Sequence, residues 1–144
     1  MCSMRALALD VGSKTIGLAI TDEVRIAAHP LRVLARVGNA GDVAAVVQAI
    51  RDRDVSDVVV GMPFELSGKL GHRARRVLDF VAALRAVLPA GVQLHEQDER
   101  FTTAEAERAL IAADVPRARR RGVIDQHAAA LILQAWLDGQ RARG

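Results

Sequence analysis

Acidic side chains stand at four positions where the chemistry of a carboxylate needs an explanation. Asp10 comes near the end of the apolar run 5–11, just before a glycine-containing turn, and Asp98 and Glu99 close the run 92–99. Asp125 lies near the start of an apolar helical segment. Carboxylates without cysteine, and without histidines at ligand spacing, suit hard divalent cations such as Mg²⁺ or Mn²⁺. Two such ions could activate a water and stabilise the leaving oxygen of a phosphodiester.

Each acid also has a purely structural interpretation. Asp10 could cap the turn that follows it, because Asx turns are common before glycine. Asp98 or Glu99 could pair with Arg100 or with a helix cation, and Asp125 could complement the positive end of a helix dipole. Three acids at the ends of predicted elements favour a metal site more than any one of them does.

The elements that must position these acids begin with strands. The runs 5–11 and 15–21 surround a tight Gly-Ser-Lys turn and predict a β-hairpin. A weaker strand is expected at 25–29, ended by Pro30. The continuous apolar run 57–61 predicts a strand buried on both faces, and 92–99 predicts a fifth strand.

Helical spacing and capping signals predict four helices, at 42–53, 73–88, 103–113 and 123–139. The third begins at a capping box, Thr102 to Glu105. Pro116 ends that stretch, so the basic run 117–121 is expected to lie between the last two helices. Trp136, at helical spacing from Leu133, is expected in the core rather than as a stacking platform.

This order of elements predicts an α/β fold, a mixed five-stranded sheet with helices on both faces. The acids converge if strands 5–11, 57–61 and 92–99 lie side by side with the last helix across their ends. The sequence has no internal repeat, low-complexity tract or Pro/Gly-rich linker, so residues 1–144 are expected to form a single domain.

Composition excludes several classes of protein. The 144 residues are 51% hydrophobic with one cysteine, which excludes a disordered chain, a disulfide framework and a cysteine-based zinc site. No apolar run reaches the roughly 18 residues of a membrane span, and no signal peptide is evident, so no membrane association and a cytoplasmic location are expected.

The net charge of +3 is unevenly distributed. Residues 77–114 hold three basic and seven acidic side chains, whereas 62–76 hold four and one, and 115–144 hold six and two. A negative segment between positive ones is typical of a metal site flanked by nucleic-acid contacts, although solvated helix faces would give the same pattern. Because aromatic residues make up only 3%, phosphate and shape contacts must carry binding, with strong salt dependence and weak sequence specificity.

Four segments carry motifs that follow one another along the chain. The first two are DVGSKTIGLA at 10–19 and GMP at 61–63, with Gly68 and Gly71 after it. The last two are DERFTT at 98–103 and Ile124-Asp125, which is followed by Ala128-Ala129 and Ile132-Leu133-Gln134. Together they resemble the motifs of the YqgF/RuvX family over nearly the whole chain. The resemblance implies a ribonuclease H-like fold, related to RuvC-type Holliday-junction resolvases. It also implies a nuclease that matures the 5′ end of 16S rRNA in the bacterial cytoplasm.

Site residues follow from the same resemblance. Asp10 takes the place of the first-strand acid, Glu99 of the later-strand acid and Asp125 of the terminal-helix acid, and together they would hold Mg²⁺ or Mn²⁺. Asp98 is the alternative middle ligand, since strand alternation lets only one of the neighbouring pair face the site. RuvC-type resolvases carry a fourth acid three residues before the helix acid, where this chain has Gly122.

Cations near these motifs are candidate phosphate contacts. They are Lys14, Lys69, Arg73, Arg76 and Arg100. RNA is the favoured substrate. A DNA four-way junction is the alternative, and it would require a homodimer presenting two sites rather than a monomer. A non-catalytic RNA-binding factor in ribosome assembly is the third interpretation, against which the acids argue, because pure binding would not gather negative charge where phosphate must sit.

Overall fold

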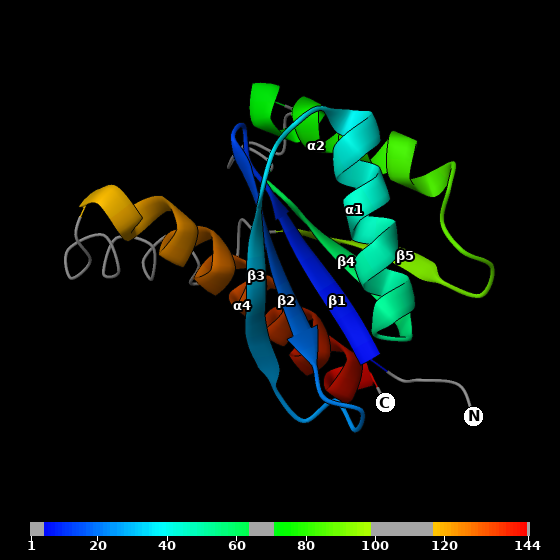
Figure 1. The fold of residues 1–144 in the computed structure, drawn as a ribbon. Coiled ribbons are helices and arrows are strands. Elements are labelled where there is room, and N and C mark those ends of the chain that lie inside the picture. The colour runs from blue at the N-terminus through cyan, green and yellow to red at the C-terminus, as the bar shows by residue number, and fades with distance from the viewer. Residues whose placement is uncertain (1–4, 64–70, 99–116, 144) are drawn as a thin grey trace.

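A five-stranded sheet forms the centre of the computed structural model, which describes residues 5–63, 71–98 and 117–143 (Figure 1). Its strands are β1 Arg5–Val11, β2 Thr15–Thr21, β3 Ala28–Ala35, β4 Val55–Met62 and β5 Gln93–Asp98. The helices are α1 Asn39–Asp52, α2 His72–Arg85 and α4 Arg117–Arg143, with side chains of α4 described for residues 127–140. None of these helices is both long and apolar enough to span a membrane.

The sheet order is β3-β2-β1-β4-β5, so β1 lies in the middle. Antiparallel pairing joins β1 to β2 and β2 to β3, whereas β4 runs parallel to β1 and β5 parallel to β4. The carboxyl ends of β1, β4 and β5 therefore meet at one edge of the sheet. The three strands thus lie side by side, which is the arrangement of strands that convergence of the acids requires.

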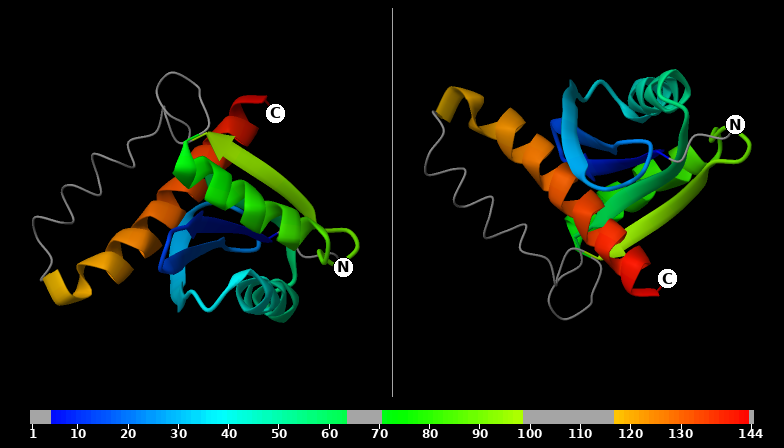
Figure 2. Two further views of the ribbon diagram at one scale, coloured as in Figure 1. Left: turned by 90° about the horizontal axis from the view of Figure 1, so that it is seen from above. Right: turned by 90° about the horizontal axis from the view of Figure 1, so that it is seen from below.

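Helices cover both faces of the sheet, as Figure 2 shows from above and below. Strand alternation sends Leu7 and Leu9 of β1 to the face covered by α1 and α2. Ala6 and Ala8 point to the other face, where they pack against α4. Small alanines on that face let the long helix approach closely, and the expected mixed α/β sheet with helices on both faces is confirmed.

The first hairpin matches its predicted bounds, but the third strand does not. The prediction of a strand at 25–29 ended by Pro30 is wrong, because β3 runs through Pro30 to Ala35. Asp22 explains the later start: its backbone oxygen accepts from the Arg25 N–H and its side chain from the Ile26 N–H, which extends the turn. β3 is an edge strand with a register shift opposite Pro30, so a residue that lacks an N–H is tolerated there.

Helix bounds also differ from expectation. The basic run 117–121 was expected to precede the last helix, yet α4 already begins at Arg117. Arginine is a good helix former and proline is favoured around a helix start, so Pro116 precedes the helix instead of separating it from the run. α2 ends at Arg85 rather than at 88. The helix expected at 103–113 lies outside the described residues.

Candidate active site

Asp10 is a nearly buried carboxylate at the carboxyl end of the central strand. Its exposure is 7%, and strand alternation places it on the same face as Ala6 and Ala8, the face that α4 covers. Gly17 is its directly opposed partner in β2, so that position of the neighbouring strand carries no side chain. Such burial is costly for a carboxylate unless donors or cations compensate its charge.

The position of Asp10 is also the place where the sheet changes direction. β1 is bonded to antiparallel β2 on one side and to parallel β4 on the other. In open α/β sheets, ligands bind outside the carboxyl ends of the parallel strands, the edge to which Asp10 belongs. Asp10 thus occupies the part of this fold where a binding site is expected.

Asp98 lies at the same edge of the sheet but on the other face. It pairs with Met62, which belongs to the core beneath α1 and α2. Within β5, Leu94 packs on that same core while His95 contacts Trp136 of α4. Alternation therefore directs Asp98 toward the α1 and α2 face, and the structure does not bring it to the face of Asp10.

The other predicted ligands are described less fully. Asp125 lies within α4, one turn before Ala129, which packs on the sheet, but its side chain is outside the described part of the structure. Glu99, Arg100 and Lys69 also lie outside the described residues. Among the side chains that are described, no three His, Cys, Asp or Glu residues group closely enough to hold a metal ion.

Three predicted substrate cations are described. Lys14 is exposed in the turn between β1 and β2, directly beyond the carboxyl end of β1. Arg73 is exposed and Arg76 half-buried in the first turns of α2, the helix that follows the carboxyl end of β4. All three positions thus lie near the connections at the edge that carries Asp10.

A buried ion pair supports the turn that carries Lys14, and sequence reasoning did not find it. The Nε of Arg36 donates to Asp42 Oδ2 at 3.0 Å, and these side chains are 11% and 1% exposed. The Nη1 of Arg36 donates to the Gly12 carbonyl at 2.9 Å, and its backbone N–H donates to the Lys14 carbonyl at 2.9 Å. The available signal was an acidic residue in the first turn of a predicted helix, at Asp42.

Comparison with known proteins identifies relatives that match nearly the whole chain. A family model described as "RuvX: Holliday junction resolvase" matches residues 4–139. The chain belongs to the RuvX family. It is 42% identical over 139 residues to a protein of Desulforudis audaxviator, covering 96% of this chain and 97% of the relative, which is named "Putative pre-16S rRNA nuclease". A relative of the same name from Moorella thermoacetica is 44% identical over 135 residues, covering 94% and 95%.

Solved structures extend the RuvX assignment to the fold. RuvC of T. thermophilus in complex with a Holliday junction substrate superposes with a TM-score of 0.63 at 16% identity, covering 96% of both chains. The fowlpox virus resolvase with its substrate junction gives 0.55 at 9% identity, covering 95% and 99%. At these identities the likeness concerns the fold alone, and it confirms the expected ribonuclease H-like architecture of a RuvX protein.

A second polar cluster of this RuvX chain joins the strands β4 and β5 to α4. Asp57 of β4 accepts a hydrogen bond from Arg25 and another, at 2.8 Å, from His95 Nε2. Burial alone would raise the pKa of Asp57, but the hydrogen bonds and charges of Arg25 and His95 outweigh it and lower the pKa below its usual value. Asp57 is therefore a stable anion that fixes two side chains around the indole of Trp136.

Trp136 is part of the core, as its helical spacing predicted. Its exposure is 7%, and it packs with Leu133 and Leu137 against the alanine face of the sheet. The Arg25 guanidinium carbon lies 5.6 Å from the indole centroid, and the His95 ring lies 5.1 Å away at an interplanar angle of 42°. The indole is thus held on the sheet by a cation and by a second ring.

Proposed function

We propose that this protein is a metal-dependent nuclease that hydrolyses phosphodiester bonds in nucleic acid, with the 5′ region of the 16S rRNA precursor as substrate. The observation that carries the proposal is the position of Asp10. A nearly buried carboxylate lies at the carboxyl end of the central strand of a resolvase-like sheet, in a chain of the RuvX family.

The donor chemistry fits a divalent cation. Asp10 supplies hard carboxylate oxygens, and the residue directly opposite it in β2, Gly17, carries no side chain. Asp10, Glu99 and Asp125 would hold Mg²⁺ or Mn²⁺. When bound, such ions lower the pKa of water and offset negative charge on the reacting phosphate.

Strand alternation supports Glu99 rather than Asp98 as the middle ligand. Asp98 faces the same side of the sheet as Met62, whereas an acid that shares a cation with Asp10 must face α4. The carboxylate of Asp125 would complete the set from α4, the helix that packs on the Asp10 face.

The remaining residues bind and orient the substrate. Lys14 and Arg100 would neutralise phosphate charge next to the acids, and Lys69, Arg73 and Arg76 would contact the backbone farther along the strand. The Arg36–Asp42 pair holds the Gly12–Lys14 turn, so the amine of Lys14 starts from a fixed backbone. Processing of rRNA in bacteria takes place in the cytoplasm, which is the proposed location.

Cleavage assays test the proposal directly. Purified protein is incubated with Mg²⁺, Mn²⁺ or EDTA and with labelled rRNA precursor, linear DNA or a four-way DNA junction, beside a folded Asp10→Asn variant. We expect RNA cleavage that requires the cation and falls to background in Asp10→Asn. Faster cleavage of the junction, by a homodimer, would replace RNA with branched DNA as the substrate. RNA binding without cleavage of any substrate would contradict the nuclease proposal and leave a binding factor.

A further inference from the structure

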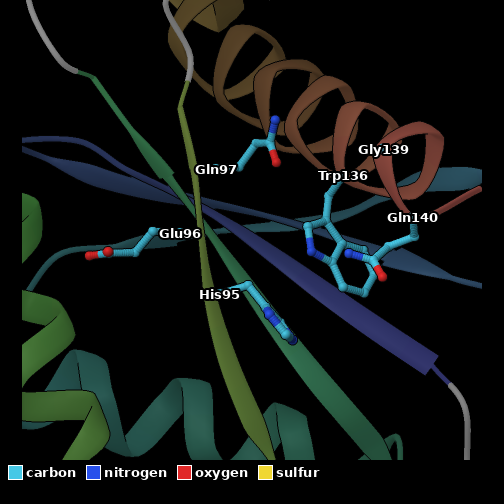
Figure 3. A pocket seen from close by; sticks show the side chains of 6 residues that line it. All are labelled: His95, Glu96, Gln97, Trp136, Gly139 and Gln140. Carbon is cyan, nitrogen blue, oxygen red and sulfur yellow. The ribbon is translucent and has the colours of Figure 1, made fainter. Parts of the chain in front are cut away.

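A small pocket lies between the edge strand β5 and the last turns of α4, on the same sheet face as Asp10 (Figure 3). Its volume is about 190 Å³, below the range of sites for drug-sized ligands. The residues that line it are His95, Glu96, Gln97, Trp136, Gly139 and Gln140. A pocket of this size accommodates a single small group rather than a folded partner.

The lining favours a neutral group with a polar edge. Gln97 and Gln140 carry amides, each with a donor NH₂ and an acceptor oxygen, and His95 adds a flat ring. Glu96 points away from α4 in Figure 3, so its carboxylate is directed away from the pocket. None of the described lining residues is Lys or Arg, so this described lining offers amides and a ring rather than cations.

The walls of the pocket are held before any ligand binds. His95 donates to Asp57 at 2.8 Å, and its ring lies 5.1 Å from that of Trp136. Arg25 contacts both Asp57 and the indole, so a charged network fixes the inner wall. The His95 side chain remains 29% exposed, which leaves part of its ring available to a flat ligand. A prearranged wall lowers the entropic cost of binding.

The register of the sheet relates the pocket to Asp10. Gln97 pairs with Gly61 in β4, and Leu9 pairs with Val60, so Asp10 and Gln97 stand at the same level of the sheet. They share the α4 face and are separated by two strand spacings, roughly 10 Å. A nucleic-acid strand cleaved at Asp10 can therefore reach the pocket with a neighbouring nucleotide.

We infer that this pocket binds one unstacked nucleobase of a single-stranded substrate, close to the cleaved bond. The base would lie against the His95 ring, with its polar edge toward the amides of Gln97 and Gln140. This inference rests on the proposed nuclease function, and it adds a base contact to a site otherwise built for the phosphate backbone. Such a pocket would favour single strands over duplexes, because a paired base cannot leave its stack without losing its pairing partner.

The chain carries its own reporter for this pocket. Trp136 is the single tryptophan of the sequence, which has no tyrosine, so the intrinsic fluorescence comes from the pocket wall. The Asp10→Asn protein, which we expect not to consume the substrate, is titrated with a short single-stranded RNA, the same RNA with abasic positions, the matching duplex and inorganic phosphate. Anisotropy of labelled RNA measures total binding in parallel.

We expect a saturable fluorescence change with the intact single strand, and little change with the abasic strand, the duplex or phosphate. Gln97→Ala and Gln140→Ala should each weaken the fluorescence-detected affinity at least fivefold. Gln93→Ala, an exposed glutamine of the same strand outside the pocket, should leave it unchanged.

Two results would overturn the inference. One is RNA binding seen by anisotropy with no change in Trp136 fluorescence, and the other is an equal response to the abasic strand. Either result leaves cleavage at Asp10 intact as a proposal. Conversely, a normal fluorescence response in a wild-type protein that cleaves nothing would contradict the nuclease function and retain the base pocket.

Discussion

Arg36 donates a hydrogen bond from Nη1 to the carbonyl oxygen of Gly12 at 2.9 Å, two residues beyond the candidate catalytic Asp10. The same guanidinium donates to the almost fully buried Asp42 and lies 5.7 Å from the ring centroid of Phe80 in α2. One cation therefore joins the first turn of the sheet to two helices. The position of the β1–β2 turn depends on an ion pair that takes no part in the chemistry.

Removing this cation should destabilise the protein. Arg36→Ala leaves Asp42 buried without its ion pair, and breaking such a pair costs about 3–5 kcal/mol. Chemical denaturation measures the change in the free energy of unfolding. Arg32→Ala, at an exposed position of β3 four residues earlier, is the matched control and should change it by less than about 0.5 kcal/mol. Equal effects of the two substitutions would contradict the role of the pair.

The two acids described at the carboxyl edge should differ in their effect on cleavage. Asp10→Asn should slow cleavage by about 100-fold or more, the scale on which losing one electrostatic stabiliser slows enzymes. Asp98→Asn should retain most of the rate, because Asp98 faces α1 and α2. Single-turnover rates at saturating Mg²⁺ make the comparison, with circular dichroism to check folding. A larger loss of rate with Asp98→Asn than with Asp10→Asn would favour Asp98 over Glu99 as the middle ligand.

Salt dependence should reveal which cations contact phosphate. Each phosphate contact on a single strand adds about 0.7 to the slope of log affinity against log salt. Lys14→Gln and Arg73→Gln should each reduce the slope by about that amount in RNA titrations from low to high salt. Arg51→Gln, an exposed change near the far end of α1, should leave the slope unaltered. An unchanged slope in all three variants would show that Lys14 and Arg73 do not contact the RNA phosphates.

Acid should weaken the fold through Asp57. Its pKa is lowered in the folded protein, because the hydrogen bonds and charges of Arg25 and His95 outweigh the opposing effect of burial. A lowered folded pKa gives stability that is present above the unfolded value and is lost as pH falls through the folded value. The free energy of unfolding of the wild type should therefore fall below about pH 4. The Asp57→Asn variant should have a lower free energy of unfolding at neutral pH, and that free energy should fall less on acidification. Urea titrations at several pH values measure both.

The sequence predicted those parts of the fold that depend on local pattern. The bounds of β1 and β2 follow from apolar runs on either side of a glycine turn, and both strands were predicted to the residue. β4 was predicted from an apolar run buried on both faces, although pairing with β1 and β5 extends it to Val55 and Met62. The position of Asp10 at the carboxyl edge of the sheet could be predicted from the end of the apolar run 5–11 alone.

The remainder depends on contacts between segments far apart in the sequence. Pro30 predicts a strand end because a lone strand gives no sign that it will lie at a sheet edge, where a missing N–H is tolerated. The basic run 117–121 resembles a connection in the sequence, so the predicted start of α4 is too late. The face of Asp98 required the register of β5 on β4, which no local pattern encodes.

The order of segments along the chain has a consequence for synthesis on the ribosome. The hairpin β1–β2 can pair as soon as it emerges, but the face that carries Ala6, Ala8 and Ala19 is covered by residues 129–137, which are translated more than a hundred residues later. Domains generally fold as units, so this face cannot reach its final packing before the last helix is available. The surface that carries Asp10 therefore lacks its helical cover until α4 is made, so the proposed site cannot be complete on a chain that is still being translated.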